Sequence, residues 1–442
     1  MVSVLISFSR ITILSFVLVF TLLDLVLLFE AKLGEGVVQV LSTIQIMMVV
    51  LFLLNGSVVL YFATENMQII FLMVLQFILF IAINVSVSKL SYTYSRTLNN
   101  NILMLLSFSF IFLERLSINT AVKQLLFAII SVSIACAVVL VLRETKHIQR
   151  QMFIFAAIGI VLLLAVSLAG QVEYGAKLSF TIGQFRVQPS EFVKLLYLFF
   201  VSGCIVVYKD IRGFIFASVG AAIHVLILVY SRDLGTGLIF LATYLLLIFI
   251  AYKNYIVLVL ELVIATLGGI FAFNYFPHIQ SRFVAWLDPL SDVENRGYQI
   301  SQSLFAIGTG GWFGSGLTNG MPTKIPVVTN DFIFAAISEE LGALVGVCLI
   351  LILMCTSVAI FNLAFTCSNS FYMLVTSGIA IIFSIQTILN IGGVIKFIPS
   401  TGVTLPFVSS GGSSLLSMFI CIYIAQCSDD LIYINKGRRD YV

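Results

Sequence analysis

Long apolar segments alternate with short polar ones along most of the chain. Each segment is continuous and close to the roughly 20 residues that a helix needs to cross a bilayer, whereas a transmembrane barrel would need shorter segments of strict alternation. The pattern predicts an all-α fold, a polytopic transmembrane helical bundle. About thirteen spans are expected, near residues 11–31, 40–63, 67–88, 101–114, 120–142, 151–170, 190–208, 213–230, 235–252, 254–276, 332–361, 371–391 and 407–427.

The composition agrees with this class of protein. Of 442 residues, 60% are hydrophobic and 10% are charged, where a soluble domain carries about 25% charged residues. The net charge of +3 gives no reason to expect a nucleic-acid partner. The seven cysteines lie within apolar segments or at their ends, and the three histidines are scattered, so neither a disulfide framework nor a protein-bound metal site is expected.

The Lys and Arg residues of the short connections predict the orientation, because cytoplasmic loops are enriched in them. Placing the 143–150 loop inside puts the larger share of these cations, together with the tail 431–442, on the cytoplasmic side. Three segments rich in Gly, Pro and polar residues then lie outside, at 171–190, 277–331 and 392–406. A loop as long as the second of these is usually functional. Cations on this face suggest an anionic ligand, with ordinary loop solvation as the alternative.

Two polar clusters stand where predicted spans begin. In the first, a Gln-Pro-Ser-Glu sequence at 188–191 opens a helix, and Lys194 would enter the membrane on the same face as Glu191. Helix capping alone would explain the serine and the glutamate, but a lysine within a span is costly and is a functional candidate by default. In the second, Asp233 precedes a span, where a capping role and a functional role are equally compatible with it.

The loop 277–331 ends at the mouth of a span. Its glycines permit close backbone approaches, and Arg282, Arg296 and Lys324 carry charges suited to phosphate oxygens. Asp331 closes the loop, and a carboxylate held there, partly out of water, has a raised pKa and suits a general base. The alternative is that this residue or its neighbour caps the next helix.

Two further groups of polar residues lie near the predicted ends of spans. Glu339 and Glu340 lie about two turns deeper in the span that follows Asp331, and we expect them either near the substrate or holding the helix bundle together. A Pro, Gly and Ser stretch that includes Ser409 and Ser413 leads into the final span. Irregular polar backbone at membrane depth is tolerated only against protein or a water-filled cavity. The stretch therefore predicts a cavity at the outer face.

Together these motifs resemble the SEDS family, the RodA-, FtsW- and SpoVE-like peptidoglycan glycosyltransferases. The resemblance covers residues 101–430 and implies a ten-span catalytic core there, with 277–331 as its large extracytoplasmic loop and 431–442 as a cytoplasmic tail. Residues 1–100 would add about three further N-terminal spans. The five motifs run in order from Gln188 to Lys194, Asp233 to Thr236, Asp288 to Leu317, Asp331 to Gly342 and Leu405 to Ser414.

The resemblance also implies an activity, the joining of lipid II units into glycan strands at the outer face of the bacterial cytoplasmic membrane, for elongation, division or sporulation. Asp331 would be the catalytic base that deprotonates the acceptor GlcNAc 4-hydroxyl, which attacks the donor with inversion and loss of undecaprenyl pyrophosphate. Lipid II, the growing glycan strand, membrane lipid, bridging Mg²⁺ or Mn²⁺ and a class B penicillin-binding protein are the implied ligands and partners. The residues expected to bind substrate are Glu191, Lys194, Arg282, Arg296, Lys324, Gln299, Gln302, Asp233, Glu339, Ser409 and Ser413.

The chain departs from the family pattern beside its catalytic aspartate, where Thr329-Asn330 replaces the usual His-Thr, and again at Lys177-Leu178 and Ser410. These departures indicate a divergent or specialised member. Two rival functions are a lipid II flippase and an inactive scaffold for a penicillin-binding protein. Transporters often show paired broken helices in two inverted halves, but here the Gly and Pro irregularities cluster on the outer side. That placement favours chemistry at the outer face.

Overall fold

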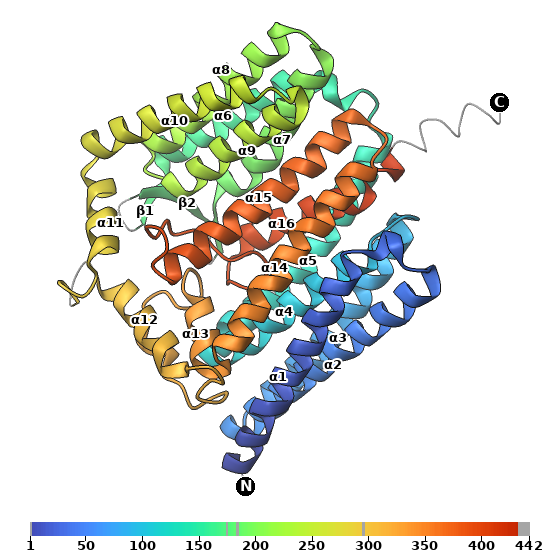
Figure 1. Ribbon diagram of the computed structural model, residues 1–442, viewed down its shortest axis with the longest axis vertical. Coiled ribbons are helices and arrows are strands. Elements are labelled where there is room, and N and C mark those ends of the chain that lie inside the picture. The colour runs from blue at the N-terminus through green and yellow to red at the C-terminus, as the bar shows by residue number, and fades with distance from the viewer. Residues whose placement is uncertain (1, 174–175, 183–184, 294–296, 432–442) are drawn as a thin grey trace.

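The computed structural model describes residues 2–173, 176–182, 185–293 and 297–431, most of which lie in helices (Figure 1). Within these residues, twelve helices are long and apolar enough to cross a membrane, and α16 (Gly412–Cys427) is a shorter apolar helix. The predicted all-α transmembrane bundle is confirmed. The twelve are α1 (Val2–Leu27), α2 (Glu35–Thr64), α3 (Met67–Leu90), α4 (Arg96–Leu116), α5 (Ile118–Glu144), α6 (Met152–Ala169), α7 (Pro189–Val207), α8 (Ile211–Tyr230), α9 (Leu234–Tyr252), α10 (Tyr255–Tyr275), α14 (Ala343–Thr366) and α15 (Ser370–Val394).

The helices α1 to α3 pack along one side of a ten-helix body made of α4 to α10 and α14 to α16 (Figure 1). α2 contacts α1, α3 and α4, and α1 also contacts α14. Gly56 on α2 lets this helix approach α4 closely, because a Cβ at that position would lie 2.5 Å from Ile111. α3 also contacts α5, so the N-terminal helices are packed into the bundle through α4, α5 and α14.

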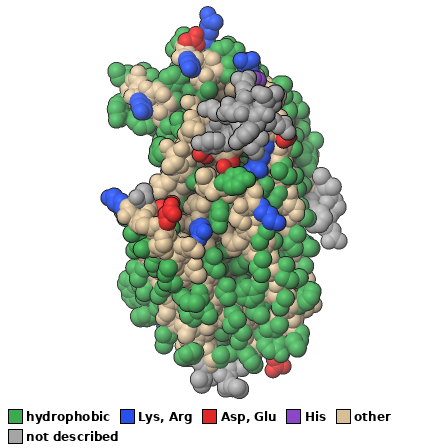
Figure 2. Space-filling view, turned by 90° about the vertical axis from the view of Figure 1, so that its right-hand side faces the viewer, with side chains coloured by type: hydrophobic (Ala, Val, Ile, Leu, Met, Phe, Trp, Pro, Cys, Tyr) green, Lys and Arg blue, Asp and Glu red, His purple; other side chains and the backbone are tan. Residues whose placement is uncertain are grey.

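Two spans have opposite surroundings. α4 is buried by protein from Thr97 to Glu114, whereas no residue of α10 is buried. α4 can therefore carry polar residues such as Asn100 and Asn101, which face other helices, while α10 presents apolar side chains to its surroundings. Figure 2 shows the same apolar character on one face of the molecule, where hydrophobic side chains cover most of the lower part and charged ones gather above.

Short elements fold the longer connections. Between α6 and α7 lies a three-stranded antiparallel sheet in the order β1-β2-β3, with Phe180 paired to Val187. The loop 277–331 contains two helices that lead towards the cavity described below. These elements are β1 (Gln171–Glu173), β2 (Ala176–Ile182), β3 (Phe185–Val187), α11 (Pro277–Leu287), α12 (Tyr298–Gly310) and the single 3-10 turns Glu30–Lys32, Ile148–Gln151 and Pro322–Lys324.

The prediction of one continuous span over 332–361 is wrong, because the chain breaks at Gly342. Gly342 has a φ of 90°, a conformation that favours glycine, and a Cβ there would lie 2.4 Å from the backbone nitrogen of Gly314. The amide of Ala343 donates a hydrogen bond of 2.8 Å to the carbonyl of Gly311. The glycine-rich loop thus fills the break and satisfies backbone groups at the interrupted helix. The two resulting helices are α13 (Ile333–Leu341) and α14.

Candidate active site

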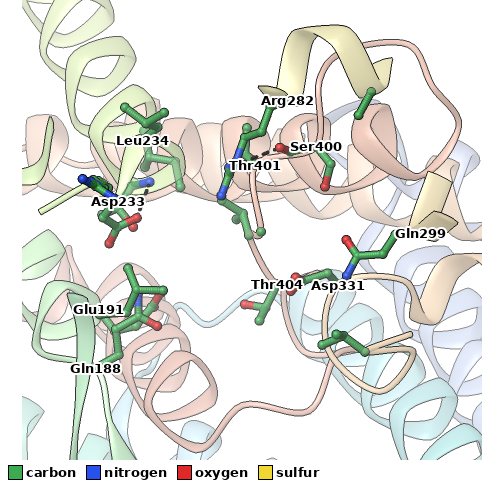
Figure 3. A pocket seen from close by; sticks show the side chains of 18 of the residues that line it. Gln188, Glu191, Asp233, Leu234, Arg282, Gln299, Asp331, Ser400, Thr401 and Thr404 are labelled. Atoms are coloured by element: carbon green, nitrogen blue, oxygen red, sulfur yellow. Dashed lines mark hydrogen bonds between the residues drawn. The ribbon is translucent and has the colours of Figure 1, made fainter. Parts of the chain in front are cut away.

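A cavity of about 300 Å³ forms where segments far apart in the sequence meet (Figure 3). Its wall is built from the first turns of α7 and α9, from α11 and α12, from the end of the loop before α13, and from the loop that follows α15. Most of the predicted polar clusters are thereby brought together. The polar side chains that line it are Gln188, Glu191, Lys194, Arg232, Asp233, Thr236, Ser281, Arg282, Gln299, Asp331, Ser400, Thr401 and Thr404.

Asp331 lies at the end of the loop before α13, on the opposite side of the cavity from Glu191 and Asp233 (Figure 3). Burial raises the pKa of the Asp331 carboxyl group to about 6, and the nearby positive charge of Arg282 opposes that rise. No side chain caps α13 with a hydrogen bond, so the capping role considered for Asn330 and Asp331 is not seen. A carboxylate with this pKa can accept a proton near neutral pH.

Arg282 on α11 is the cation whose charge acts on the Asp331 carboxylate. Its guanidinium donates a hydrogen bond of 3.2 Å to the carbonyl of Ser400. Burial lowers the pKa of Arg282, while the charges of Asp233 and Asp331 raise it. Arg282 therefore interacts with two acidic groups, Asp233 and Asp331. The three residues come from segments that are far apart in the sequence.

Asp233 caps α9 and also faces the cavity. Its Oδ1 accepts a hydrogen bond of 3.2 Å from the amide of Thr236, and its Oδ2 accepts one of 3.3 Å from the Ser190 hydroxyl. Burial raises the pKa of the Asp233 carboxyl group, although the cap hydrogen bonds act against the rise. The capping role predicted for Asp233 is confirmed, and its place in the cavity wall is compatible with a second role.

Glu191 and Lys194 form a buried ion pair on α7. Lys194 Nζ lies 2.8 Å from Glu191 Oε1 and donates a second hydrogen bond of 3.0 Å to Gln386 Oε1. Glu191 Oε2 accepts a hydrogen bond of 3.0 Å from the Ser417 hydroxyl on α16. Because both charges are compensated from three helices, the pair acts as a rigid part of the cavity wall.

Two amide side chains on α15, which sequence reasoning missed, hold the cavity loops. Gln386 Nε2 donates to the carbonyl of Thr404 at 3.0 Å. Asn390 Nδ2 donates to the carbonyls of Asp331 at 2.9 Å and Val403 at 2.6 Å. A signal was present in the sequence, since two amides four residues apart lie on one face of a helix within an otherwise apolar segment.

Several predicted residues lie away from the cavity. Lys324 is exposed, and Gln302 is half-buried on α12 outside the cavity lining, whereas Gln299 one turn earlier lines it. Ser413 accepts a hydrogen bond of 3.1 Å from the amide of Gln188, so it lies behind the first turn of α7. Arg296 lies outside the described residues.

Three further residues support the loops around Asp331 from behind. Ser409 donates a hydrogen bond to the carbonyl of Asn330, and Glu339 Oε1 accepts one of 2.8 Å from the amide of Met321. Glu340 forms an ion pair of 3.0 Å with Arg115 at the end of α4. For the two glutamates these contacts favour the alternative that they hold the bundle together.

The described residues contain no group of three or more His, Cys, Asp and Glu side chains arranged to hold a metal ion. Asp233 and Asp331 do offer carboxylate oxygens to the same cavity, but Arg282 already neutralises part of their charge. A divalent cation would fit here only if a ligand such as a phosphate supplied most of its coordination, as Mg²⁺ sites often arrange.

Comparisons with known proteins identify the family of the chain. A family model described as "Cell cycle protein", for FtsW, RodA and SpoVE, matches residues 89–428. The peptidoglycan glycosyltransferase RodA of Mycobacterium tuberculosis is 35% identical over 345 residues, which are 72% of this chain and 71% of that protein. The probable peptidoglycan glycosyltransferase FtsW of Wigglesworthia glossinidia brevipalpis is 35% identical over 306 residues, 66% of this chain and 79% of that protein.

Two solved structures share the fold. The rod shape determining protein RodA of Thermus thermophilus superposes with a TM-score of 0.56 at 22% identity, covering 76% of this chain and 97% of that one. A chain from a peptidoglycan synthase complex, whose structure concerns the coordination of polymerization and crosslinking, gives a TM-score of 0.65 at 22% identity and covers 76% and 98%. With the family match and the curated relatives, these findings show that the chain belongs to the SEDS family of membrane glycosyltransferases.

Proposed function

We propose that this protein polymerises lipid II into glycan strands and that Asp331 is its catalytic base. The observation that carries the proposal is the carboxyl group of Asp331, which faces the cavity with a pKa raised to about 6 and has Arg282 close by. Curated relatives at 35% identity are named peptidoglycan glycosyltransferases, which supports the reaction class.

The proposed reaction follows from these two groups. Asp331 takes the proton of the acceptor GlcNAc 4-hydroxyl, and the oxygen attacks the anomeric carbon of the donor with inversion. A new C–O bond forms as the bond to the pyrophosphate oxygen breaks, and undecaprenyl pyrophosphate leaves with the electron pair. A general base contributes about 10² to 10⁴ in rate. Arg282 is placed to stabilise the charge that develops on the leaving group.

Lys194 and Arg282 differ as candidates for binding pyrophosphate, because only Lys194 is in an ion pair. Its charge is balanced by Glu191 in the cavity wall, so its contribution to binding pyrophosphate is small compared with that of Arg282. We further propose that Mg²⁺ or Mn²⁺ arrives with the substrate phosphates. Its role is open to a direct test, because chelation with EDTA would then lower the rate without unfolding the protein.

We place the cavity on the outer face of the bacterial cytoplasmic membrane and propose a class B penicillin-binding protein as partner. The excess of Lys and Arg in the short loops on the other side supports the orientation. The structural relative from a complex that couples polymerization with crosslinking supports a transpeptidase partner.

The decisive experiment incubates the purified full-length protein with lipid II and Mn²⁺ or Mg²⁺, alone and with its candidate partner, and resolves glycan strands by gel electrophoresis. Asp331→Asn is the test variant. Asp210→Asn is the matched control, because Asp210 is an exposed cap at the start of α8 and asparagine caps a helix as well. We expect strands from the wild type and the control, and none from Asp331→Asn.

The opposite results separate the rival functions. Strands from Asp331→Asn at the wild-type rate would remove Asp331 as the base. No strands from the folded wild type with its partner would contradict a polymerase. In that case, movement of labelled lipid II across vesicles would distinguish a flippase from a scaffold.

A further inference from the structure

A buried carboxylate without a counter-ion lies far from the catalytic cavity, in the N-terminal helices. Asp24, one turn before the end of α1, is 0% exposed. Its Oδ2 makes no hydrogen bond, and no lysine, arginine or histidine of the described residues forms an ion pair with it. A charge inside a bilayer is costly, and such residues almost always have a partner or a function.

Polar side chains from three helices surround Asp24. Gln45 on α2 lies 3.5 Å from Asp24 Oδ1 and in turn accepts a hydrogen bond of 3.1 Å from Asn100 on α4. Asn101 on α4 and the Cys355 thiol on α14 also lie next to Asp24. Ser42, one turn before Gln45, accepts a hydrogen bond of 3.0 Å from Asn100 through its carbonyl. Each of these side chains is at most 3% exposed.

Three buried oxygens of this group accept no hydrogen bond, and one amide nitrogen donates none. Asp24 Oδ2, both polar atoms of the Asn101 amide and the Ser42 hydroxyl are buried without a hydrogen bond. Leaving buried polar groups unpaired costs free energy, so in native proteins such groups usually have a protein group, a water molecule or an ion as partner. Carboxylate, amide and hydroxyl oxygens are the donors that hard cations prefer. One carboxylate among neutral oxygens balances a single positive charge.

We propose that Asp24, Asn101 and Ser42 bind an alkali cation such as Na⁺ at the junction of α1, α2 and α4. The bound ion would neutralise Asp24 and join the N-terminal helices to the first helix of the region that the family model matches. Glu114 provides a contrast within the same interface. It is also a buried carboxylate on α4, and its Oε1 accepts a hydrogen bond of 2.6 Å from the Gln76 amide of α3, which leaves two unpaired oxygens there, Glu114 Oε2 and Gln76 Oε1, instead of three.

The test measures thermal unfolding of the full-length protein in detergent at constant pH and ionic strength, with NaCl replacing choline chloride stepwise. We expect the melting temperature of the wild type to rise by a few degrees and to saturate, as for a ligand that binds only the folded state. Asp24→Asn should lose the rise, and Asn101→Ala should shift its midpoint at least about tenfold towards higher Na⁺. Glu114→Gln, the matched control, should keep the wild-type rise in melting temperature.

Direct binding of radioactive Na⁺ to the wild type tests the proposal even if a variant does not fold. The wild type and Glu114→Gln should each bind about one ion per chain. A melting temperature that does not respond to NaCl in the wild type, a full response in Asp24→Asn, or no bound Na⁺ would overturn the proposal and indicate that Asp24 holds a proton. No part of the test depends on glycan synthesis, so its outcome is independent of the proposed function.

Discussion

The two sides of the cavity differ in how their charges are compensated. On the α7 side, Glu191 and Lys194 form a buried pair with further hydrogen bonds from Gln386 and Ser417. On the other side, Asp331 and Arg282 influence each other's charge, but the described contacts include no ion pair between them. Compensated charges form a stable wall, whereas uncompensated ones are available to a substrate. We therefore assign a stabilising role to the α7 side and a chemical role to the side with Asp331 and Arg282.

Asp331→Asn should separate chemistry from stability most strongly. Asparagine fills the same space but cannot act as a base, so we expect glycan synthesis to fall by about 10² to 10⁴. The melting temperature should stay the same or rise, because a buried carboxylate is removed. Initial rates and thermal unfolding on one preparation measure both. A variant that loses stability in proportion to its activity would place Asp331 in the wall instead.

Lys194→Met should have the opposite profile. It leaves Glu191 buried without its cation, which costs about 3–5 kcal/mol of stability. The double variant Glu191→Gln with Lys194→Met removes both charges and should recover much of that loss. Chemical or thermal unfolding of both variants measures the difference. A single variant as stable as the wild type would show that water reaches the pair.

Arg282→Gln should change both the rate and its pH dependence. We expect a loss of about 10² in rate, as when one charge-stabilising donor is removed from an active site. A base works in its deprotonated form, so the wild-type rate should fall as the pH drops through about 6, the raised pKa of Asp331. Since Arg282 lowers that pKa, the variant should lose activity at a higher pH. Arg282→Lys should keep the midpoint near that of the wild type, and an unchanged midpoint in Arg282→Gln would mean that the two groups do not interact.

Asn390→Ala should produce the smallest effect. It removes two hydrogen bonds that hold the backbone of Asp331 and Val403, each worth about 0.5–1.5 kcal/mol. We expect kcat to fall about tenfold with the pH midpoint unchanged, because Asn390 positions the loops without touching the reacting atoms. Thr387→Ala is the control on the same helix, since the buried Thr387 hydroxyl makes no hydrogen bond. Equal losses in the two variants would point to general loosening of α15.

The spans could be predicted from the sequence because crossing a bilayer requires a long apolar segment, and this requirement is local. The break at Gly342 could not, since the apolar pattern continues through it and its cause is a close approach by Gly314. The same limit explains why Lys324 and Gln302, both within predicted motifs, lie outside the cavity lining. Their residue types fit a polar ligand, but the direction of a side chain depends on the folded loop.

The site residues also divide into those that the local sequence predicts and those that depend on contacts between distant segments. Asp331, Arg282 and Asp233 were identified because charges are rare in this chain and stand out at the ends of spans. Gln386 and Asn390 were not predicted, because two amides four residues apart indicate a shared helix face but not which backbone groups they bind. Their importance depends on partners in other segments, which only the three-dimensional arrangement reveals.

The burial of α4 by protein has a consequence for the biogenesis of the molecule. A helix with three consecutive asparagines, Asn99 to Asn101, and with Glu114 and Arg115 at its other end is a poor substrate for insertion into lipid on its own. α1, α2 and α3 are synthesised earlier, and α2 and α3 contact α4 in the finished bundle. As α4 leaves the insertion machinery, these helices are already in the bilayer to receive its polar face. The order of the helices along the chain is thus also an order of assembly.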